Sequence, residues 1–278
     1  MKNWKLHPHN SNVAEYIDCY WFLERQNKDR ILEYPKLNPD PAAHLILASA
    51  GQEYQFDYGS EPSKGKGSHW IFPHCKTLVM DHSRSFTILG IKFHVGALYS
   101  LNIKPKQPVI DQIIEFDINQ ITRSKGIQES ELLMTAEKDS ERCREILDKL
   151  LAPWLFDTHQ DRHSQLVKRA YPLLSDIPVS QMGEALQCSQ RTIERSFLRV
   201  TGLTLKQCQS MDRLEAMLQH LQNLEEKDID WADVANLFGF SDQSHLIRYL
   251  KTNIGKTPVK YVQQRDLAID IYGDFEES

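Results

Sequence analysis

The spacing of apolar residues changes character part-way along the chain. Up to about residue 115, short runs of β-branched and aromatic residues are separated by Gly, Pro, Asn and Asp, which is typical of strands and turns. The segments 38–41 and 59–67 are rich in turn formers, and the second predicts a mobile hairpin loop. Many short strands with turns between them predict a small barrel or jelly roll. The clearest strand runs are 16–23, 44–48, 54–58, 76–80 and 86–93.

From about residue 128 to 156 the apolar spacing becomes helical. Apolar residues recur along one stripe, and Pro153 follows as the expected helix stop. Packing of this stripe against the β domain is the default, and pairing with the same helix of a second subunit is the alternative. Residues 154–156 then predict a buried anchor, and 157–163 a polar linker. The stripe consists of Cys143, Ile146, Leu147, Leu150 and Leu151.

Two segments near the C-terminus repeat one pattern, a short amphipathic helix, a tight turn and a second helix. In the first copy 180–189 leads into 190–197, and in the second 231–241 leads into 242–248. The second helix of each copy has a polar, cationic outer face, as a helix in a DNA major groove requires. The sequence therefore predicts tandem helix-turn-helix units that read two successive grooves.

Inner faces and helix caps support this assignment. Ser189, Asp230 and Ser241 are the expected N-caps, since their side chains accept hydrogen bonds from the first turn. Gly202 ends the first reading helix, where a left-handed residue is favoured. The expected inner residues are Val179, Met182, Ala185, Leu186, Ile193, Phe197 and Val200, then Trp231, Val234, Ala235, Phe238, Leu246, Tyr249 and Leu250.

The outer faces supply the candidate DNA-binding residues. Arg pairs with guanine and Gln with adenine, and the first turns of a reading helix enter the groove. Arg199, further along, is expected to meet phosphate, and Ile247 suits a thymine methyl group. The candidates are Gln190, Arg191, Glu194, Arg195 and Arg199 in the first unit, and Gln243, Ser244, Ile247, Arg248 and Lys251 in the second.

Residues 164 to 265 resemble the DNA-binding domain of AraC/XylS-type transcriptional regulators. The likeness is carried by Gly-Phe-Ser-Asp-Gln-Ser-His-Leu-Ile-Arg at 239–248, by 255–261, and by 189–202 in the first half. It implies two helix-turn-helix units joined by a long helix at about 204–222. Carried over by position, it implies base reading by Arg191, Glu194, Arg195, Gln243, Ser244, Ile247 and Arg248.

The resemblance has departures and a weaker N-terminal counterpart. Met217 stands where a small residue is usual on the joining helix, and Gly183 where Ala is usual. Leu246 and Leu250 replace Phe, and Pro172 falls inside the first expected helix of the domain. Residues 90–101 resemble the cupin-like sensor half of some of these regulators, which implies a β-barrel without naming its ligand.

Composition adds constraints. The net charge of −5 is unusual for a DNA-binding protein, yet 243–265 holds five basic residues and no acidic one, and 266–278 is an acidic tail. Five dispersed cysteines without a CxxC predict reduced thiols, with Cys188 and Cys208 as small core residues rather than a redox switch. We expect a cytoplasmic protein, because neither a signal peptide nor a membrane-spanning run is present.

Two further classes of site are weighed. His44, His69, His74, His82 and His94 lie in the β-rich half, but no H-x-H pair occurs there, and His7 and His9 belong to an expected unstructured terminus. The 59–67 loop lacks the phosphate-binding order of Gly and Lys. We therefore expect no metal, no cofactor and no catalytic residue.

The sequence predicts an α+β protein of two domains. A cupin-like β-barrel effector or dimerisation domain covers 1–115, a helical connector covers 116–162, and a tandem helix-turn-helix domain covers 163–278. The expected function is sequence-specific transcriptional regulation, with activation or repression left open. The alternatives are a ligand-independent regulator whose β domain only dimerises, and a β-barrel enzyme with an accessory helical domain.

The expected partners are double-stranded DNA, a small-molecule effector, RNA polymerase and a second copy of the chain in a homodimer, with no membrane. An organic effector is favoured because the strands are rich in aromatic residues without metal-ligand spacing. These residues are Tyr20, Trp21, Phe22, Tyr54, Phe56, Tyr58, Trp70 and Phe72.

Overall fold

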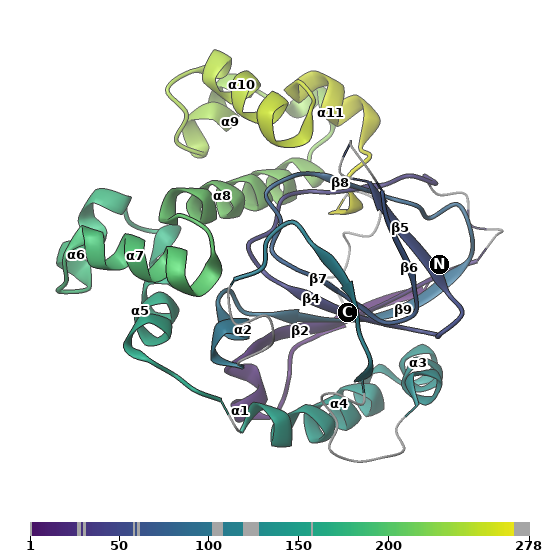
Figure 1. Ribbon diagram of the computed structural model, residues 1–278. Helices are drawn as coiled ribbons and strands as arrows, with labels where there is room; N and C mark the ends of the chain where they lie inside the picture. Colours follow the sequence, from purple (N-terminus) through teal and green to yellow (C-terminus); the bar gives the residue numbers. More distant parts are fainter. Residues whose placement is uncertain are drawn as a thin grey trace.

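The computed structural model of the chain describes residues 2–26, 29, 32–57, 59, 62–101, 108–118, 128–156 and 158–269. A β-rich domain comes first and a helical region follows, with helix α8 (Leu205–Gln222) between the last helices and the sheets (Figure 1). Tyr58, predicted in a strand, and most of the acidic tail lie outside the described residues.

The strands of the β domain pair antiparallel in two sheets. The larger has the order β1-β2-β9-β4-β7-β10 and the smaller β3-β8-β5-β6. They form the expected cupin-like domain, but the two sheets are not joined into a closed barrel among the described strands. The strands are β1 (Lys2–Leu6), β2 (Ile17–Arg25), β3 (Lys36–Leu37), β4 (His44–Ala48), β5 (Glu53–Asp57), β6 (Ser63–Lys66), β7 (His69–Ile71), β8 (Leu78–Met80), β9 (Phe86–Phe93) and β10 (Ile113–Glu115).

Both faces of the larger sheet are covered, which explains why Ile17 and the run from Cys19 to Leu23 of β2 are apolar on both faces. Successive side chains of a strand point to opposite faces. Tyr20 and Phe22 belong to the core shared with helices α3 (Glu129–Lys138) and α4 (Ser140–Leu155), whereas Trp21 packs with the core between the sheets. The alternation of apolar and polar residues that is typical of a sheet with one exposed face is therefore confined to the smaller sheet.

The predicted helical stripe packs within the chain. Cys143, Leu147 and Leu151 are buried in the same core as the strand residues, so the default packing is confirmed. The region that was expected to form one helix forms two, because Asp139 is extended and caps α4 by accepting the Arg142 N–H. Pro153 was expected to stop this helix, which instead continues to Leu155, since a proline near the C-terminal end costs only one internal hydrogen bond.

Other local predictions were wrong. The expected unstructured terminus contains β1, and the His9 backbone N–H donates to Asp148 at 2.9 Å. Part of the expected hairpin loop is strand β6. In the expected buried anchor only Leu155 is buried, and Phe156 is 80% exposed. Two further short helices flank the strands, α1 (Ser11–Ala14) and α2 (Ala97–Ser100).

The C-terminal region is helical throughout. Pro172 does not kink a long helix, because α5 ends before it and a 3₁₀ turn begins. None of the helices in the described ranges combines the length and the apolar character that a membrane crossing needs. In order, the helices are α5 (Arg162–Ala170), the 3₁₀ turns η2 (Tyr171–Leu174) and η3 (Val179–Gln181), α6 (Met182–Ala185), α7 (Gln190–Thr201), α8, the 3₁₀ turn η4 (Glu226–Asp228), α9 (Trp231–Leu237), α10 (Gln243–Ile254) and α11 (Pro258–Gln264).

Helix α8 joins two separate helical cores. Its first half contributes Leu205, Cys208 and Met211 to the core that contains Ile193 and Phe197 of α7. Its second half contributes to the core of α9, α10 and α11. Those second-half residues are Leu214, Met217, Leu218 and Leu221. The predicted joining helix over 204–222 is confirmed, with Thr204 as its N-cap.

Candidate DNA-binding and effector sites

Helix α7 has the expected form of a reading helix. The Ser189 side chain accepts the Thr192 N–H, and Gly202 ends the helix at a φ of 75°. Ile193 and Phe197 are fully buried. The supporting helix α6 is only one turn long, and Ala185, expected inside, is exposed, because a helix this short has little inner face.

The outer face of α7 is available to solvent. Arg191, Glu194 and Arg195 are exposed, and Gln190 is half-buried. The Gln190 Nε2 donates to Glu194 Oε1 at 3.2 Å, so these two side chains restrain each other. Arg199 differs from the rest, because its Nε donates to the Tyr99 hydroxyl at 2.9 Å.

The second unit has the expected inner face but a different cap. Asp230 caps α9 as predicted, accepting the Ala232 and Asp233 N–H groups. The predicted cap Ser241 is wrong, since Asp242 accepts the His245 N–H and α10 begins one residue later. Both residue types can cap, and the extended backbone of Asp242 brings its carboxylate to the helix start.

The outer face of α10 also matches the prediction in its exposure. Gln243, Ser244, Arg248 and Lys251 are exposed, and Ile247 is half-buried. Inside, Leu246 and Leu250 are buried, whereas Tyr249 is half-buried and its hydroxyl donates to the Ser210 carbonyl of α8.

The predicted basic segment is less cationic at its surface than its count suggests. Lys256 is 6% exposed and pairs with Asp266 at 2.5 Å. The Arg265 guanidinium donates to the Leu221 and Leu224 carbonyls, which ends α8. Asp266 is thus part of an ion pair rather than of a solvated tail.

Both helical units contact the β domain. On the first unit, Tyr99 accepts from Arg199 and donates to Asp161 at 2.8 Å. On the second, the Lys36 N–H donates to the Asp266 carbonyl at 2.8 Å, and the Lys36 ammonium lies 3.1 Å from the Asp266 carboxylate. The β domain therefore bridges the two units.

A cavity of about 340 Å³ lies among the strands of the two sheets. Its walls are apolar and aromatic, with Trp21, Ile71 and Ile88 from the larger sheet and Tyr54 and Phe56 from the smaller. The Trp21 indole lies directly on the β9 backbone, where a Cβ on Gly90 would approach it to 1.9 Å. Glycine at this position therefore shapes one wall.

The cavity is bounded on one side by the C-terminal helical region. Glu215, Gln219 and Gln222 of α8 line it, together with Ala268 and Ile269 that follow α11. These α8 residues recur at helical spacing on one face. The cavity thus borders the helix that joins the two helix-turn-helix units.

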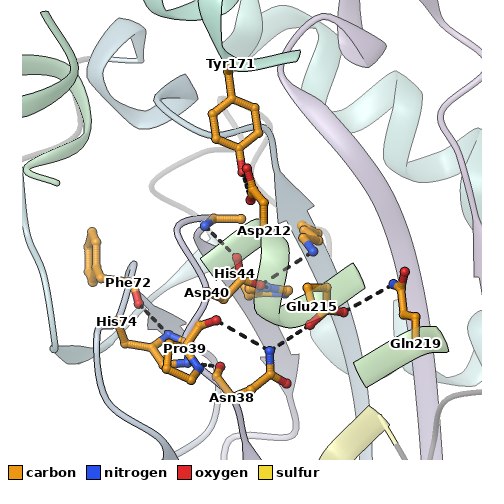
Figure 2. A network of polar contacts seen from close by, with 12 residues as sticks. Asn38, Pro39, Asp40, His44, Phe72, His74, Tyr171, Asp212, Glu215 and Gln219 are labelled. Carbon is orange, nitrogen blue, oxygen red and sulfur yellow. Dashed lines mark hydrogen bonds and ion pairs between the residues drawn. The ribbon is translucent and has the colours of Figure 1, made fainter. Parts of the chain in front are cut away.

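A buried polar network crosses between the domains at this boundary (Figure 2). The Asn38 Nδ2 donates to Glu215 Oε2 at 2.7 Å, joining residues 177 positions apart. Beside it, the Asp40 carboxylate accepts from the Ala42 N–H at 2.7 Å and lies 3.1 Å from His44 Nε2. The Lys92 ammonium lies 3.5 Å from the same carboxylate.

The network fixes the charge of its members. Burial by itself would raise the pKa of Asp40, but Lys92 and the hydrogen bond from His44 outweigh it and hold that pKa well below its usual range. Asp40 in turn raises the pKa of Lys92. Burial raises the pKa of Glu215; Lys92 opposes this shift and Asp40 adds to it.

Comparisons with known proteins agree with these two halves. The helix-turn-helix domain family matches residues 182–264, and a domain of unknown function, DUF6597, matches residues 5–115. The C-terminal part of the chain therefore contains a helix-turn-helix domain. No curated protein sequence matches the chain.

Three solved structures are similar to this chain at low identity. An apo variant of ToxT from Vibrio cholerae is 10% identical, with 93% of this chain and 99% of that chain covered and a TM-score of 0.47. ToxT from the same organism bound to an unsaturated fatty acid is 10% identical, with 99% and 96% covered and a TM-score of 0.45. The AraC-like transcriptional activator CuxR is 8% identical, with 77% and 86% covered and a TM-score of 0.29.

Among the described residues, the histidines do not gather around a metal site. Within the described ranges, no group of three or more His, Cys, Asp and Glu side chains is placed to hold a metal ion. His74 is buried and lies 2.9 Å from the Asn38 carbonyl, and His69 is buried beside the cavity. Cys208 is buried, which raises its pKa to about 12, and Cys188 is half-buried.

Sequence reasoning missed the interdomain network. Asn38 lies in a predicted turn, and Glu215 lies on the outer side of a predicted helix. The available signal was the polar stripe Asp212, Glu215, Gln219 and Gln222 along α8, but an exposed helix has the same pattern. Only the contact between the two domains distinguishes a polar stripe that packs on another domain from the polar face of an exposed helix.

The outer faces lead to a prediction about base reading. Arg195→Ala and Arg248→Ala should each weaken specific DNA binding by about 1–3 kcal/mol and relax base preference at separate positions about 10 bp apart. Footprints and affinities on selected DNA check this, with Arg142→Ala on α4 as the exposed control. Loss of the same base positions in both variants would contradict the tandem arrangement.

The network leads to a prediction about pH. Burial raises the pKa of Asp212 from 3.8 to about 6, although the hydrogen bond from Tyr171 opposes the shift; Asp40 and Glu215 raise it, and Lys92 lowers it. Between these values the folded chain retains a proton that the unfolded chain releases, so the free energy of unfolding falls as pH rises from about 4 to 6.

Asp212→Asn should remove this contribution and stabilise the protein at pH 7 by about 1–2 kcal/mol. Asn keeps an acceptor for the Tyr171 hydroxyl. Denaturant unfolding at pH 4.5, 5.5 and 7 measures the effect, with the exposed Asp176→Asn as the control. An unchanged pH slope in Asp212→Asn would refute this assignment.

A third prediction concerns Arg199. Tyr99→Phe removes the hydroxyl that accepts from this guanidinium and leaves the Asp161 carboxylate, 3.8 Å away, as its remaining described contact, so Arg199 should become freer to meet phosphate. We expect specific DNA affinity to rise about two- to fivefold, the scale of one net hydrogen bond. Fluorescence anisotropy at several salt concentrations tests it against Tyr34→Phe, which alters a phenol that is 52% exposed. A weaker or unchanged affinity counts against competition between Tyr99 and DNA.

Proposed function

We propose that this regulator reads two successive major-groove segments and is controlled by a small organic effector bound in its β domain. The division into 1–115, 116–162 and 163–278 belongs to the proposal, as do base reading from α7 and α10 and the phosphate contacts. The observation that carries it is the pair of capped helices with exposed polar faces, each on its own core and both joined by α8.

The cavity supports the effector part of the proposal. A largely apolar cavity with a few polar groups at one end suits a small organic ligand. Because α8 residues line it, an occupant has direct contact with the helix that sets the two reading helices relative to each other. The ligand and DNA are then coupled, and each must change the affinity for the other by the same factor.

Self-association and a contact with RNA polymerase complete the proposal. The apolar stripe of α4 is buried within its own chain, so a homodimer uses another surface. This favours a role for the β domain in sensing, whether or not it also pairs with a second copy.

The experiment that tests the proposal uses the full chain and a random duplex library. Selection should return a bipartite site with two elements about 10 bp apart. Ile71→Trp should fill part of the cavity, leave the unliganded affinity for this site within about threefold, and abolish its response to metabolite fractions that shift the wild type. Thermal unfolding shows whether the variant is folded, and Ile88→Phe provides a second, smaller filling.

Selection of no sequence, or of one undivided element, would contradict the reading of two grooves. A response that survives in both folded filling variants would place the effector outside this cavity.

A further inference from the structure

The charges around the cavity are unevenly distributed. It is lined by four carboxylates and two lysines, and the outer carboxylate, Glu53, already pairs with Lys66 and Arg84 at 3.2 and 2.8 Å. At the inner end the Asp40 carboxylate lies 3.5 Å from the Lys92 ammonium. The lining residues are Asp40, Glu53, Asp81 and Glu215, with Lys5 and Lys92.

Glu215 stands apart in this set. Its oxygens accept hydrogen bonds from two neutral amides, Asn38 at 2.7 Å and Gln219 at 3.4 Å. Among the described residues, no Lys or Arg side chain forms an ion pair with it; Lys92 and Lys5 act on it only from a longer distance and oppose the rise of its pKa. A buried carboxylate without a cation in direct contact is costly, so this end of the cavity favours a positive charge.

His69 adds a further hydrogen-bond acceptor to the lining, its ring nitrogen Nε2. Its side chain lies in the cavity lining at 3% exposure, and its Nδ1 lies 3.0 Å from the Gly67 carbonyl, to which it donates. Burial lowers the pKa of His69 to about 4, so the ring is neutral and its Nε2 can only accept. No hydrogen-bond partner for Nε2 occurs in the described part of the chain.

The aromatic walls suit the same kind of ligand. Trp21, Tyr54, Phe56 and Phe86 line the cavity, and the electron-rich faces of such rings attract cations as well as apolar surface. A carboxylate ligand, by contrast, would face Asp40 and Glu215 and would compete with Asp40 for Lys92. The lining of the cavity therefore offers hydrogen-bond acceptors and negative charge, which suit a ligand that has donors and a positive charge.

We propose that the effector is a small aromatic amine, whose ammonium group pairs with Glu215 on α8 while its ring lies among the aromatic side chains. This inference rests on the proposed function, since it names the ligand class of the same cavity. A volume of about 340 Å³ is at the lower end for ligand sites and suits one or two rings. The cation then contacts the joining helix of the DNA-binding domain directly.

The test compares ligands that share a body and differ in charge. Tryptamine, indole-3-acetamide and indole-3-acetate form one series, and phenethylamine, phenylacetamide and phenylacetate a smaller one. Isothermal titration of the full chain at pH 7 should give the amine at least a tenfold lower Kd than the amide in one series or both. The acid should bind most weakly.

Variants of the two carboxylates supply the matched control. Glu215→Gln keeps an acceptor for Asn38 and should weaken amine binding about tenfold while leaving amide binding within about threefold. Glu53→Gln changes a carboxylate at the rim of the same cavity that is already paired, and should leave amine binding within about twofold. Thermal unfolding of both variants confirms that they are folded.

The proposal is overturned if the acid or the amide binds as tightly as the amine, or if folded Glu215→Gln binds the amine like the wild type. Failure of all six compounds to bind at millimolar concentration also overturns it. These titrations contain no DNA, so such a failure leaves the selected bipartite site intact. Loss of that site, with amine binding retained, would instead sink the proposed function and leave the ligand class standing.

Discussion

Three surfaces meet on helix α8, two of them apolar and one polar. One stripe of its first half is buried with α7, and a stripe of its second half is buried with α10. A third stripe, from Asp212 through Glu215 and Gln219 to Gln222, is polar, and its last three members line the cavity of the β domain. The helix cannot rotate or shift without disturbing a core at each end, because packed interiors tolerate little displacement. The relative placement of the two reading helices is therefore set by α8.

The polar stripe is what connects this helix to the β domain. A hydrogen bond from Asn38 to Glu215 and the paired charges of Asp40 and Lys92 occupy the boundary. Buried charges are retained only when they are paired or hydrogen-bonded, so each member constrains its neighbours. Asp40 is fully engaged, whereas Glu215 is held by neutral amides. Glu215 is thus the residue of this boundary at which a change in local charge would affect both domains.

The parts of the fold that could be predicted are those with long periodic patterns. Strands β4 and β9 match their predicted runs, since segments of five and eight residues that are mostly apolar and lie between turn formers leave few alternatives. Strand β6 could not be found, because Ser-Lys-Gly-Lys carries no apolar pattern and pairs only through its neighbour β5. Ser241 and Asp242 are both suitable N-cap residues, and only the backbone geometry of the folded chain determines that Asp242 caps α10. The role of Glu215 could not be predicted, because it depends on a contact with Asn38, 177 positions away, which no local sequence pattern indicates.

This division has a physical reason that bears on how the regulator works. DNA reading depends on local features, namely caps, turns and the outer faces of short helices, which recur in both units and are visible in sequence. The proposed effector site, by contrast, is made of residues brought together from both domains, such as Trp21 and Tyr54 with Glu215. A ligand can shift the arrangement of two domains only through a difference in its contacts between the two arrangements. In the proposed function, the specificity of the response would therefore depend on the side chains of this interface, which also hold the two domains together.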